Sequence, residues 1–272
     1  MPDATKFQFT NPSVPKAYDE FFVPRLEPWA KLLLDEIAPR EGQVLIDVAT
    51  GPGTVARLAA LRLGSRGRVV ATDIAPAMLN IARAKPALRG AAPIEYVESP
   101  AAPLNVPSSA FDVVVCQQGL QFFPDRLYAL QEMRRVLKAA GHAAIAVWTE
   151  IERNEIFAAI HAALSAAALP ELADLTTAPF SWHDGAELKS MAEEAGFREV
   201  RLLTRTLPML FENGLEQAVQ SFSASPASPE VAALPQSAQD AFFSRLRREL
   251  SRLAANGEVI GKMVSNIIIA HA

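Results

Sequence analysis

The sequence predicts an α/β fold in which helices cover both faces of a mostly parallel, doubly wound sheet. Short runs rich in valine and isoleucine recur in the first 150 residues, for example at Val44–Val48 and Phe111–Cys116. Segments with apolar residues at helical spacing separate these runs. The first run also leads directly into a glycine-rich turn and a helix. Strands that are apolar throughout and alternate with helices are typical of a parallel sheet buried between two helical layers.

Five strands and three connecting helices are expected in the first half of the chain. The strands are Val44–Val48, Arg68–Asp73, Ile94–Val97, Phe111–Cys116 and Ala143–Trp148, and the helices are Thr54–Leu63, Pro76–Lys85 and Asp125–Leu137. Residues 1–14 are expected to be flexible. Apolar residues at helical spacing then extend from Pro15 to Ile37, and we expect Pro24 and Pro28 to divide this region into two short helices.

The second half is predicted to add two strands and two helical insertions to a single domain that spans residues 1–272. The elements expected there are a helix at Glu152–Leu169, a helix that follows a capping box at Asp184 and Glu187 and stops at Gly196, a strand at Glu199–Leu207, a loop at Ser221–Pro235, a helix at Gln239–Ala255 and a strand at Met263–Ala270. The insertions, at about 150–183 and 212–257, are expected to form a helical lid over the substrate.

The composition excludes several classes of protein. A net charge of −4 over 272 residues gives no basic surface for nucleic acid or an anionic membrane. Cys116 is the one cysteine and the four histidines are far apart, so neither a disulfide nor a Cys/His metal cluster is expected. No apolar run reaches the roughly 18 residues of a membrane span. No secretory signal is visible either, and we expect a cytoplasmic protein.

The stretch QVLIDVATGPGT, residues 43–54, is a candidate ligand site. A strand that feeds a glycine-rich turn directs backbone N–H groups and the positive end of a helix at whatever binds there. Gly51 and Gly53 lack a Cβ, so a ligand can approach the main chain closely. An ordinary turn between a strand and a helix would show the same two glycines.

Polar residues at the ends of the other strands favour a nucleoside ligand. In open parallel sheets, ligands bind outside the carboxyl ends of the strands. Asp47 ends the first strand, and Asp73 ends the second about 20 residues past the glycines, where a carboxylate can accept both hydrogen bonds of a ribose diol. Glu98 and Ser99 follow the third strand, and the fourth runs into CQQGLQFFPD.

Two cofactors fit this pattern. A dinucleotide requires small residues in G-x-G-x-x-G spacing, which Gly51, Gly53 and Ala56 meet in a relaxed form. However, Asp47 would repel a pyrophosphate at close range. S-adenosylmethionine carries an ammonium group, a ribose and a sulfonium in place of phosphates, and a carboxylate beside the glycines suits it.

With these residues, the chain resembles the class I S-adenosylmethionine-dependent methyltransferases, and among them the UbiE-like small-molecule group. The resemblance is strong from about Tyr18 to Trp148 and looser beyond. It rests on LIDVATGPGTVA, VVATDIAPAMLNIAR, FDVVVCQQGLQFFPD, ALQEMRRVLKAAGHAAIAVW and AEEAGF, in the right order and spacing. It implies a Rossmann-like, seven-stranded sheet of order 3-2-1-4-5-7-6 with the last strand antiparallel.

The same resemblance implies which residues bind S-adenosyl-L-methionine. Asp47 and the backbone of Ala49, Thr50, Gly51 and Gly53 would hold the methionine portion, Asp73 the ribose, Ile74 and Met78 the adenine face, Ser99 and Pro100 the adenine edge, and Cys116, Gln117 and Gln118 the sulfonium. From the residues alone, Tyr18 and Phe22 either close over the glycine loop or belong to a helical layer that packs on the sheet. Two positions depart from the family. Many relatives have aspartate at Ser99, and Ala49 replaces a frequent glycine. The second change is expected to be small, since alanine tolerates most turns except those with positive φ.

The acceptor is expected to be a small, apolar or aromatic molecule, and the enzyme a monomer or homodimer. Residues that could face the acceptor are Phe22, Gln121, Phe122, Trp148 and His183. No catalytic base is assigned, because no candidate histidine or carboxylate has a hydrogen-bonding partner at a sequence spacing typical of a catalytic pair. A nicotinamide-dependent oxidoreductase and a protein that binds S-adenosylmethionine without transferring its methyl group remain the alternative functions.

Overall fold

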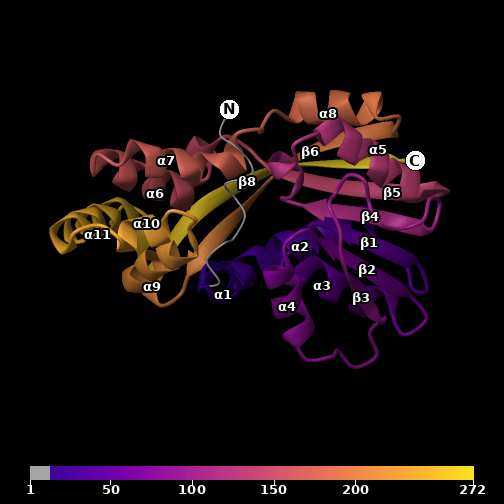
Figure 1. Cartoon of the computed structure of the whole chain (residues 1–272), viewed down its shortest axis with the longest axis horizontal. Coiled ribbons are helices and arrows are strands. Elements are labelled where there is room, and N and C mark those ends of the chain that lie inside the picture. Colours follow the sequence, from indigo (N-terminus) through magenta and orange to yellow (C-terminus); the bar gives the residue numbers. More distant parts are fainter. Residues whose placement is uncertain (1–12) are drawn as a thin grey trace. The chain divides into compact units, whose positions relative to one another are not determined.

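The strands of the computed structural model, which describes residues 13–272, form one sheet in the order β3-β2-β1-β4-β5-β8-β6 (Figure 1). A two-residue strand, β7, pairs with β8 in antiparallel fashion. Every pairing from β3 to β5 is parallel. The strand bounds are β1 Val44–Val48, β2 Arg68–Asp73, β3 Ile94–Glu98, β4 Phe111–Gln117, β5 Leu137–Trp148, β6 Arg198–Phe211, β7 Ala254–Ala255 and β8 Glu258–His271.

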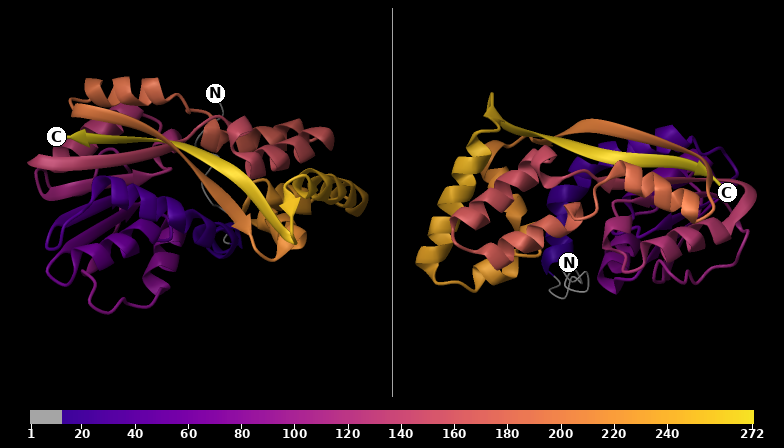
Figure 2. Two further views of the ribbon diagram at one scale, coloured as in Figure 1. Left: turned by 180° about the vertical axis from the view of Figure 1, so that it is seen from behind. Right: turned by 90° about the horizontal axis from the view of Figure 1, so that it is seen from above.

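The last long strand, β8, runs antiparallel to both of its neighbours. Residue numbers rise along β5 and β6 as they fall along β8, and both views of Figure 2 show β6 and β8 side by side. On the β5 side, Ala272 N donates to Gly141 O and Ser265 Oγ donates to Val147 O. On the β6 side, the Arg198 side chain donates to Ala272 O and Thr204 Oγ1 donates to Asn266 Oδ1. The predicted strand order and the antiparallel last strand are therefore confirmed.

Helices pack on both faces of the sheet, with α3 and α4 on one side and α5 and α8 on the other (Figure 1). The first of these layers also receives Leu33 of α2, which packs in one cluster with Leu45 and Val113 of the sheet, and all three are fully buried. Burial of such side chains contributes about 1.5–3 kcal/mol each. The helix bounds are α2 Val23–Ile37, α3 Thr54–Leu63, α4 Pro76–Ala84, α5 Arg126–Val136 and α8 Gly185–Glu194.

The expected break at Pro24 and Pro28 is wrong. The helix α1 (Ser13–Ala17) continues through a π-helical turn at Tyr18–Phe22 into α2, which contains Pro28. Pro24 comes directly after the π-helical turn, where Val23 N donates to Tyr18 O and the regular i→i−4 ladder is already interrupted. Pro28 does interrupt the hydrogen-bond ladder, at roughly 3 kcal/mol, but burial of the apolar face that follows it outweighs this cost. Residues 1–12, most of the segment expected to be flexible, lie outside the described residues.

Several element bounds differ from the sequence prediction. Helix α5 ends at Val136, so Gly141 lies inside a longer β5. The loop predicted at Ser221–Pro235 contains a 3-10 turn and the short helix α10 (Ser228–Ala232). The helix predicted at Gln239–Ala255 is α11, Gln236–Ser251, and β8 begins five residues earlier than expected. The ends of these elements depend on contacts with distant strands, and a local sequence pattern does not show those contacts.

The chain divides into two compact units. Of the described residues, the first comprises 13–26, 148–182 and 206–264, and the second 27–147, 183–205 and 265–272. The first unit is mostly helical, and α11 packs on α6 and α9 (Figures 1 and 2). Its remaining helices are α6 Glu155–Ala166, α7 Pro170–Thr177 and α9 Gly214–Gln220. Both predicted insertions fall almost entirely within it; a lid role for them stays a prediction. No helix in residues 13–272 is both long and apolar enough to span a membrane.

Within the first unit, the fully buried side chain of Asn154 fastens the start of α6 to β8. Its Nδ2 donates to Glu150 O at 2.9 Å, and its Oδ1 accepts from Val264 N at 3.0 Å. We predict that Asn154→Leu, which keeps the size of the side chain, lowers the free energy of unfolding by about 2–4 kcal/mol, because it leaves buried backbone groups unpaired. Urea denaturation measures this. The exposed Asn80→Leu is the control, and equal effects of the two substitutions would contradict the assignment.

Candidate functional site

The carboxylate of Asp47 holds the first glycine-rich loop in place. It lies near the carboxyl end of β1 and is only 1% exposed. Its Oδ2 accepts a hydrogen bond from Thr50 Oγ1 at 2.6 Å and another from Ala56 N at 3.0 Å. One carboxylate oxygen therefore ties together the end of the strand, the loop and the first turn of α3.

The loop backbone adopts the left-handed conformation at three positions. Gly51 has φ of 55° and Gly53 has φ of 82°. A Cβ on Gly53 would lie 3.2 Å from the Cβ of Ala82 and 3.3 Å from the hydroxyl of Tyr96, so the position requires glycine on two counts. Ala49 also has positive φ, 58°, which costs an alanine about 1–2 kcal/mol. The expectation that alanine would be a small change here is wrong, because the turn demands a conformation that favours glycine.

Asp73 braces the same loop from the end of β2. Its Oδ2 accepts from Gly51 N and its Oδ1 from Ala75 N, both at 2.8 Å. In addition, Thr50 N donates to Thr72 O at 2.9 Å. An ionised carboxylate offers about four acceptor sites, so these bonds leave room for the hydroxyl groups of a ribose.

Two acidic side chains thus share a buried environment. Burial raises the pKa of Asp47 to about 7, and the hydrogen bonds from Thr50 and Ala56 only partly oppose this. The neighbouring Asp73 raises the pKa of Asp47 further. Burial also raises the pKa of Asp73 above its ordinary value. A cation placed beside the pair would favour the ionised forms, whereas a phosphate would oppose them.

The positions expected to bind adenine differ in how open they are. Ile74 follows β2 and is 63% exposed, which is unusual for an isoleucine, whereas Met78 is buried in α4. Ser99 is buried too, and its hydroxyl donates to Pro100 O at 2.8 Å and accepts from Asn105 N at 2.9 Å. The Ser99 side chain is therefore committed to its own loop, and its backbone N–H donates to Asp73 O at 3.0 Å.

The end of β4 gathers buried amide groups. Among residues 13–272, the Oε1 atoms of Gln117 and Gln118 and both amide atoms of Gln121 are buried without a hydrogen-bond partner. Gln118 has φ of 56°, and its Nε2 donates to Ser265 Oγ at 2.9 Å. Cys116 is fully buried, and burial raises its pKa to about 12, so its thiol is not a nucleophile.

The remaining expected site residues lie in both units. His183 and Phe122 belong to the second unit, where His183 O accepts from Asn266 Nδ2. Tyr18, Phe22 and Trp148 belong to the first. There the Tyr18 and Phe22 rings lie 5.9 Å apart, in the π-helical turn that opens the chain's first long helix. Such turns are often found at functional sites.

Sequence reasoning missed Ser265, which contacts Gln118 from the last strand. The signal was present, since Ser265 and Asn266 form a polar pair inside the otherwise apolar MVSNIIIA. Both side chains are buried. Buried polar side chains need partners, so a polar pair in a central strand points to a neighbouring polar group.

Comparisons with known proteins identify the family. The profile of the ubiE/COQ5 methyltransferase family matches residues 22–209.

The chain belongs to the ubiE/COQ5 methyltransferase family.

Among curated proteins, the chain is similar to the ubiquinone/menaquinone biosynthesis C-methyltransferase UbiE of Shewanella frigidimarina, with 28% identity over 184 residues, covering 63% of this chain and 73% of the relative. Among solved structures, a SAM-dependent methyltransferase of Aquifex aeolicus has 25% identity and a TM-score of 0.55, covering 71% and 92% of the two chains. Phosphoethanolamine N-methyltransferase 2 of Haemonchus contortus, in complex with S-adenosyl-L-methionine, has 17% identity and a TM-score of 0.56, covering 90% and 52%.

The family assignment decides between the cofactors that the sequence left open. This methyltransferase uses S-adenosyl-L-methionine, and the nicotinamide alternative is discarded. The donor set at the site fits that cofactor, because the carboxylates of Asp47 and Asp73 both hold the loop, and a cationic group beside them is favoured over a pyrophosphate.

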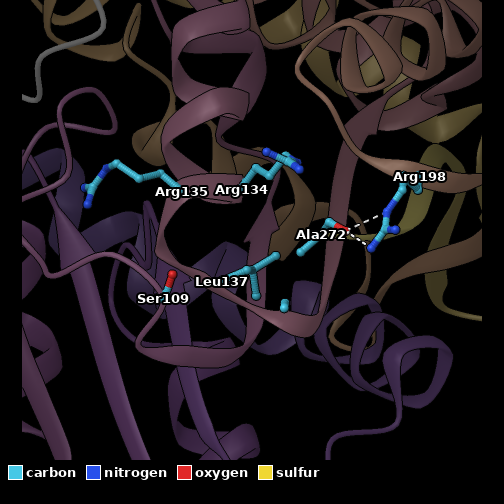
Figure 3. A pocket seen from close by; sticks show the side chains of 7 residues that line it. Ser109, Arg134, Arg135, Leu137, Arg198 and Ala272 are labelled. Atoms are coloured by element: carbon cyan, nitrogen blue, oxygen red, sulfur yellow. Dashed lines mark hydrogen bonds between the residues drawn. The ribbon is translucent and has the colours of Figure 1, made fainter.

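Figure 3 shows a separate cavity of about 440 Å³. Leu137 and Arg198, which line it, begin β5 and β6, whereas Asp47 lies near the carboxyl end of β1, so the cavity is at the opposite end of the sheet. It is bordered by the first residues of β5 and β6 and the end of α5. Two of the arginines that line it are engaged by other groups, since Arg135 pairs with Glu132 and Arg198 donates to Ala272 O. Arg134 and Arg135 also point away from each other (Figure 3). This cavity is not part of the methyltransferase site.

The raised pKa of Asp47 leads to a pH-dependent prediction. Its folded-state pKa, about 7, exceeds its ordinary value of 3.8, so the ligand-free fold loses stability as pH rises between these values. Asp47→Asn keeps an oxygen for Thr50 and Ala56 but removes the charge. Relative to the wild type, we expect its melting temperature to rise by more at pH 8.5 than at pH 5, because at pH 5 only part of this stability has been lost, while its affinity for S-adenosylmethionine falls. Thermal melts at both pH values test this, and a pH-independent difference would contradict it.

Gln121 gives a second stability prediction. Its side chain is 2% exposed and both amide atoms lack a hydrogen-bond partner among residues 13–272. An unpaired buried polar group costs about 1–3 kcal/mol. Gln121→Met should therefore raise the melting temperature of the ligand-free methyltransferase by a few degrees. The exposed Gln131→Met is the control and should change nothing. A clear decrease for Gln121→Met would mean that the amide is paired in solution.

Proposed function

We propose that this methyltransferase transfers a methyl group to a small, apolar or aromatic molecule at the carboxyl ends of β1, β2 and β4. The observation that carries the proposal is that Asp47 and Asp73 both accept hydrogen bonds from the glycine-rich loop that follows β1. Asp47 anchors its two ends and Asp73 binds the N–H of Gly51 at its centre. Two carboxylates about one loop suit a ligand with a cation at one end and a ribose in the middle.

In this proposal, Asp47 and the backbone of residues 49–53 hold the ammonium and carboxylate of the methionine portion. The unused acceptor sites of Asp73 receive the ribose hydroxyls. Ile74, exposed in the ligand-free chain, covers the adenine, and burying its side chain supplies binding energy at about 25 cal/mol per Å².

The residues contribute to catalysis by positioning. Bound S-adenosylmethionine supplies a methyl group that is already activated, and the acceptor atom displaces the sulfur as S-adenosylhomocysteine leaves. Holding the two reacting atoms in line and near contact can supply roughly 7–11 kcal/mol of the barrier. The buried carboxylates keep the cofactor's cationic end fixed, and no general base is assigned to the chain. The acceptor proton, if one is lost, passes to solvent.

Support for an apolar acceptor comes from aromatic side chains in the first unit. Phe22 stacks on Phe157 with ring centroids 5.4 Å apart, and Phe157 contacts Phe180 at 5.2 Å. Phe22 and Phe180 are buried, so an acceptor that packs among these rings would be apolar or aromatic. The Shewanella relative is named as a C-methyltransferase of ubiquinone and menaquinone biosynthesis, and that name is consistent with the aromatic acceptor proposed here for this chain.

The ribose assignment is tested by binding. Asp73→Ala should weaken S-adenosylhomocysteine binding by about 1.5–3 kcal/mol, roughly 10- to 150-fold, because hydrogen bonds to a charged group are lost. Isothermal titration calorimetry measures the affinity. The exposed Asp240→Ala is the control. Unchanged affinity in Asp73→Ala would place the ribose elsewhere.

Methyl transfer itself is tested by incubating the wild type with S-adenosylmethionine and a panel of phenols, hydroquinones and apolar amines. We expect S-adenosylhomocysteine to form with at least one aromatic acceptor, detected by mass spectrometry. Tight cofactor binding without product from any acceptor would contradict the proposal and favour a protein that binds the cofactor without transferring its methyl group.

A further inference from the structure

Ser265 determines how the side chain of Gln118 is oriented. Ser265 is fully buried in β8, and its Oγ lies 2.8 Å from Val147 O and 2.9 Å from Gln118 Nε2. A serine hydroxyl has a single hydrogen, and the Val147 carbonyl can only accept. The hydroxyl therefore donates to Val147 and accepts from the Gln118 amide. This network fixes the amide nitrogen toward Ser265 and the amide oxygen away from it.

The backbone of Gln118 is also held in an unusual conformation. Its φ of 56° lies in the left-handed region, which costs a residue other than glycine about 1–2 kcal/mol. The N–H of Gln118 donates to Ala146 O at 2.9 Å, which keeps the residue at the end of β4. Strain of this kind persists where the surrounding structure enforces it, and it is concentrated at functional sites.

The amide oxygen of Gln118 is buried, and among residues 13–272 it has no hydrogen-bond partner. Gln121, three residues later, is buried with both amide atoms unpaired. Folded proteins rarely leave such groups unpaired, since each costs about 1–3 kcal/mol. Ser265 holds the amide nitrogen of Gln118, whereas the amide oxygen has no hydrogen-bond partner among residues 13–272. This indicates that a hydrogen-bond donor of a ligand pairs with the oxygen.

We propose that Gln118 Oε1 accepts a hydrogen bond from an O–H or N–H group of the methyl acceptor, and that Ser265 is the positioning residue that aims it. This inference rests on the proposed function and narrows the acceptor to an apolar molecule with a neutral donor, such as a phenolic hydroxyl. An anionic group is disfavoured, because the end of β4 adjoins β1 with its buried Asp47. The amide of Gln121 provides a second donor and acceptor for the same polar group.

The test uses a matched pair of probes, 2-naphthol and 2-methoxynaphthalene, which differ in the presence of an O–H donor. Each is titrated by calorimetry into the full chain saturated with S-adenosylhomocysteine. We expect the wild type to bind 2-naphthol at least tenfold more tightly than its methyl ether. Gln118→Leu should abolish this preference, and Gln118→Met serves if the leucine variant does not fold. Ser265→Ala should give an intermediate preference, because the amide is then free to turn.

The matched control is Ser221→Ala. Ser221 is also a fully buried serine, and its hydroxyl donates to the backbone oxygen of Ala218 at 2.7 Å, but it belongs to the first unit. Ser221→Ala should lose about as much stability as Ser265→Ala and keep the full preference for 2-naphthol. A general structural effect would instead reduce the preference in both serine variants.

Three results would overturn the proposal. The first is that the wild type binds the two probes equally or binds neither, and the second is that the Gln118 variants keep the preference for 2-naphthol. The third is weaker S-adenosylhomocysteine binding in the Gln118 variants, which would assign Gln118 Oε1 to the cofactor. Failure of the proposed function is separate, because it shows as wild-type protein that binds S-adenosylhomocysteine yet forms none from S-adenosylmethionine with any acceptor.

Discussion

The buried carboxylate of Asp47 is the constraint on which the rest of the site depends. Removing an isolated carboxylate from water is costly, and the raised pKa of Asp47 reflects that cost. The hydrogen bonds from Thr50 and Ala56 offset part of it and determine the path of the chain between β1 and α3. An apolar residue would avoid this cost, and in the proposed function the acid is retained for the charge that it presents to the cofactor.

The parallel sheet brings the other groups to this point. In the register of β1 and β2, Val48 pairs with Thr72, so Asp73 emerges beside the loop that follows β1. Its carboxylate then binds Gly51 N and completes the support of the loop. On the other side of β1, β4 brings the strained Gln118 to the same edge of the sheet, and β8 contributes Ser265 to hold it. The strand order thus brings the loop, the two carboxylates and the Gln118 amide to the same edge of the sheet.

The sequence predicted the parts of this site that are local. Asp47, Gly51, Gly53 and Asp73 stand at strand ends that apolar runs identify directly, and their spacing carries the nucleoside pattern. The sheet order came from resemblance to a family. The contact between Gln118 and Ser265 joins residues 147 positions apart, and no local pattern reveals it. The helix through Pro28 was likewise decided by burial in the tertiary structure, and the positive φ of Ala49 by the geometry of the turn.

A crystal structure of the complex with S-adenosylhomocysteine tests the central claim most directly. The account predicts that the amino group of the ligand lies beside Asp47 and the backbone of residues 49–53, with both ribose hydroxyls within hydrogen-bond distance of Asp73. A ligand bound at another edge of the sheet, or a ribose that does not contact Asp73, would contradict it.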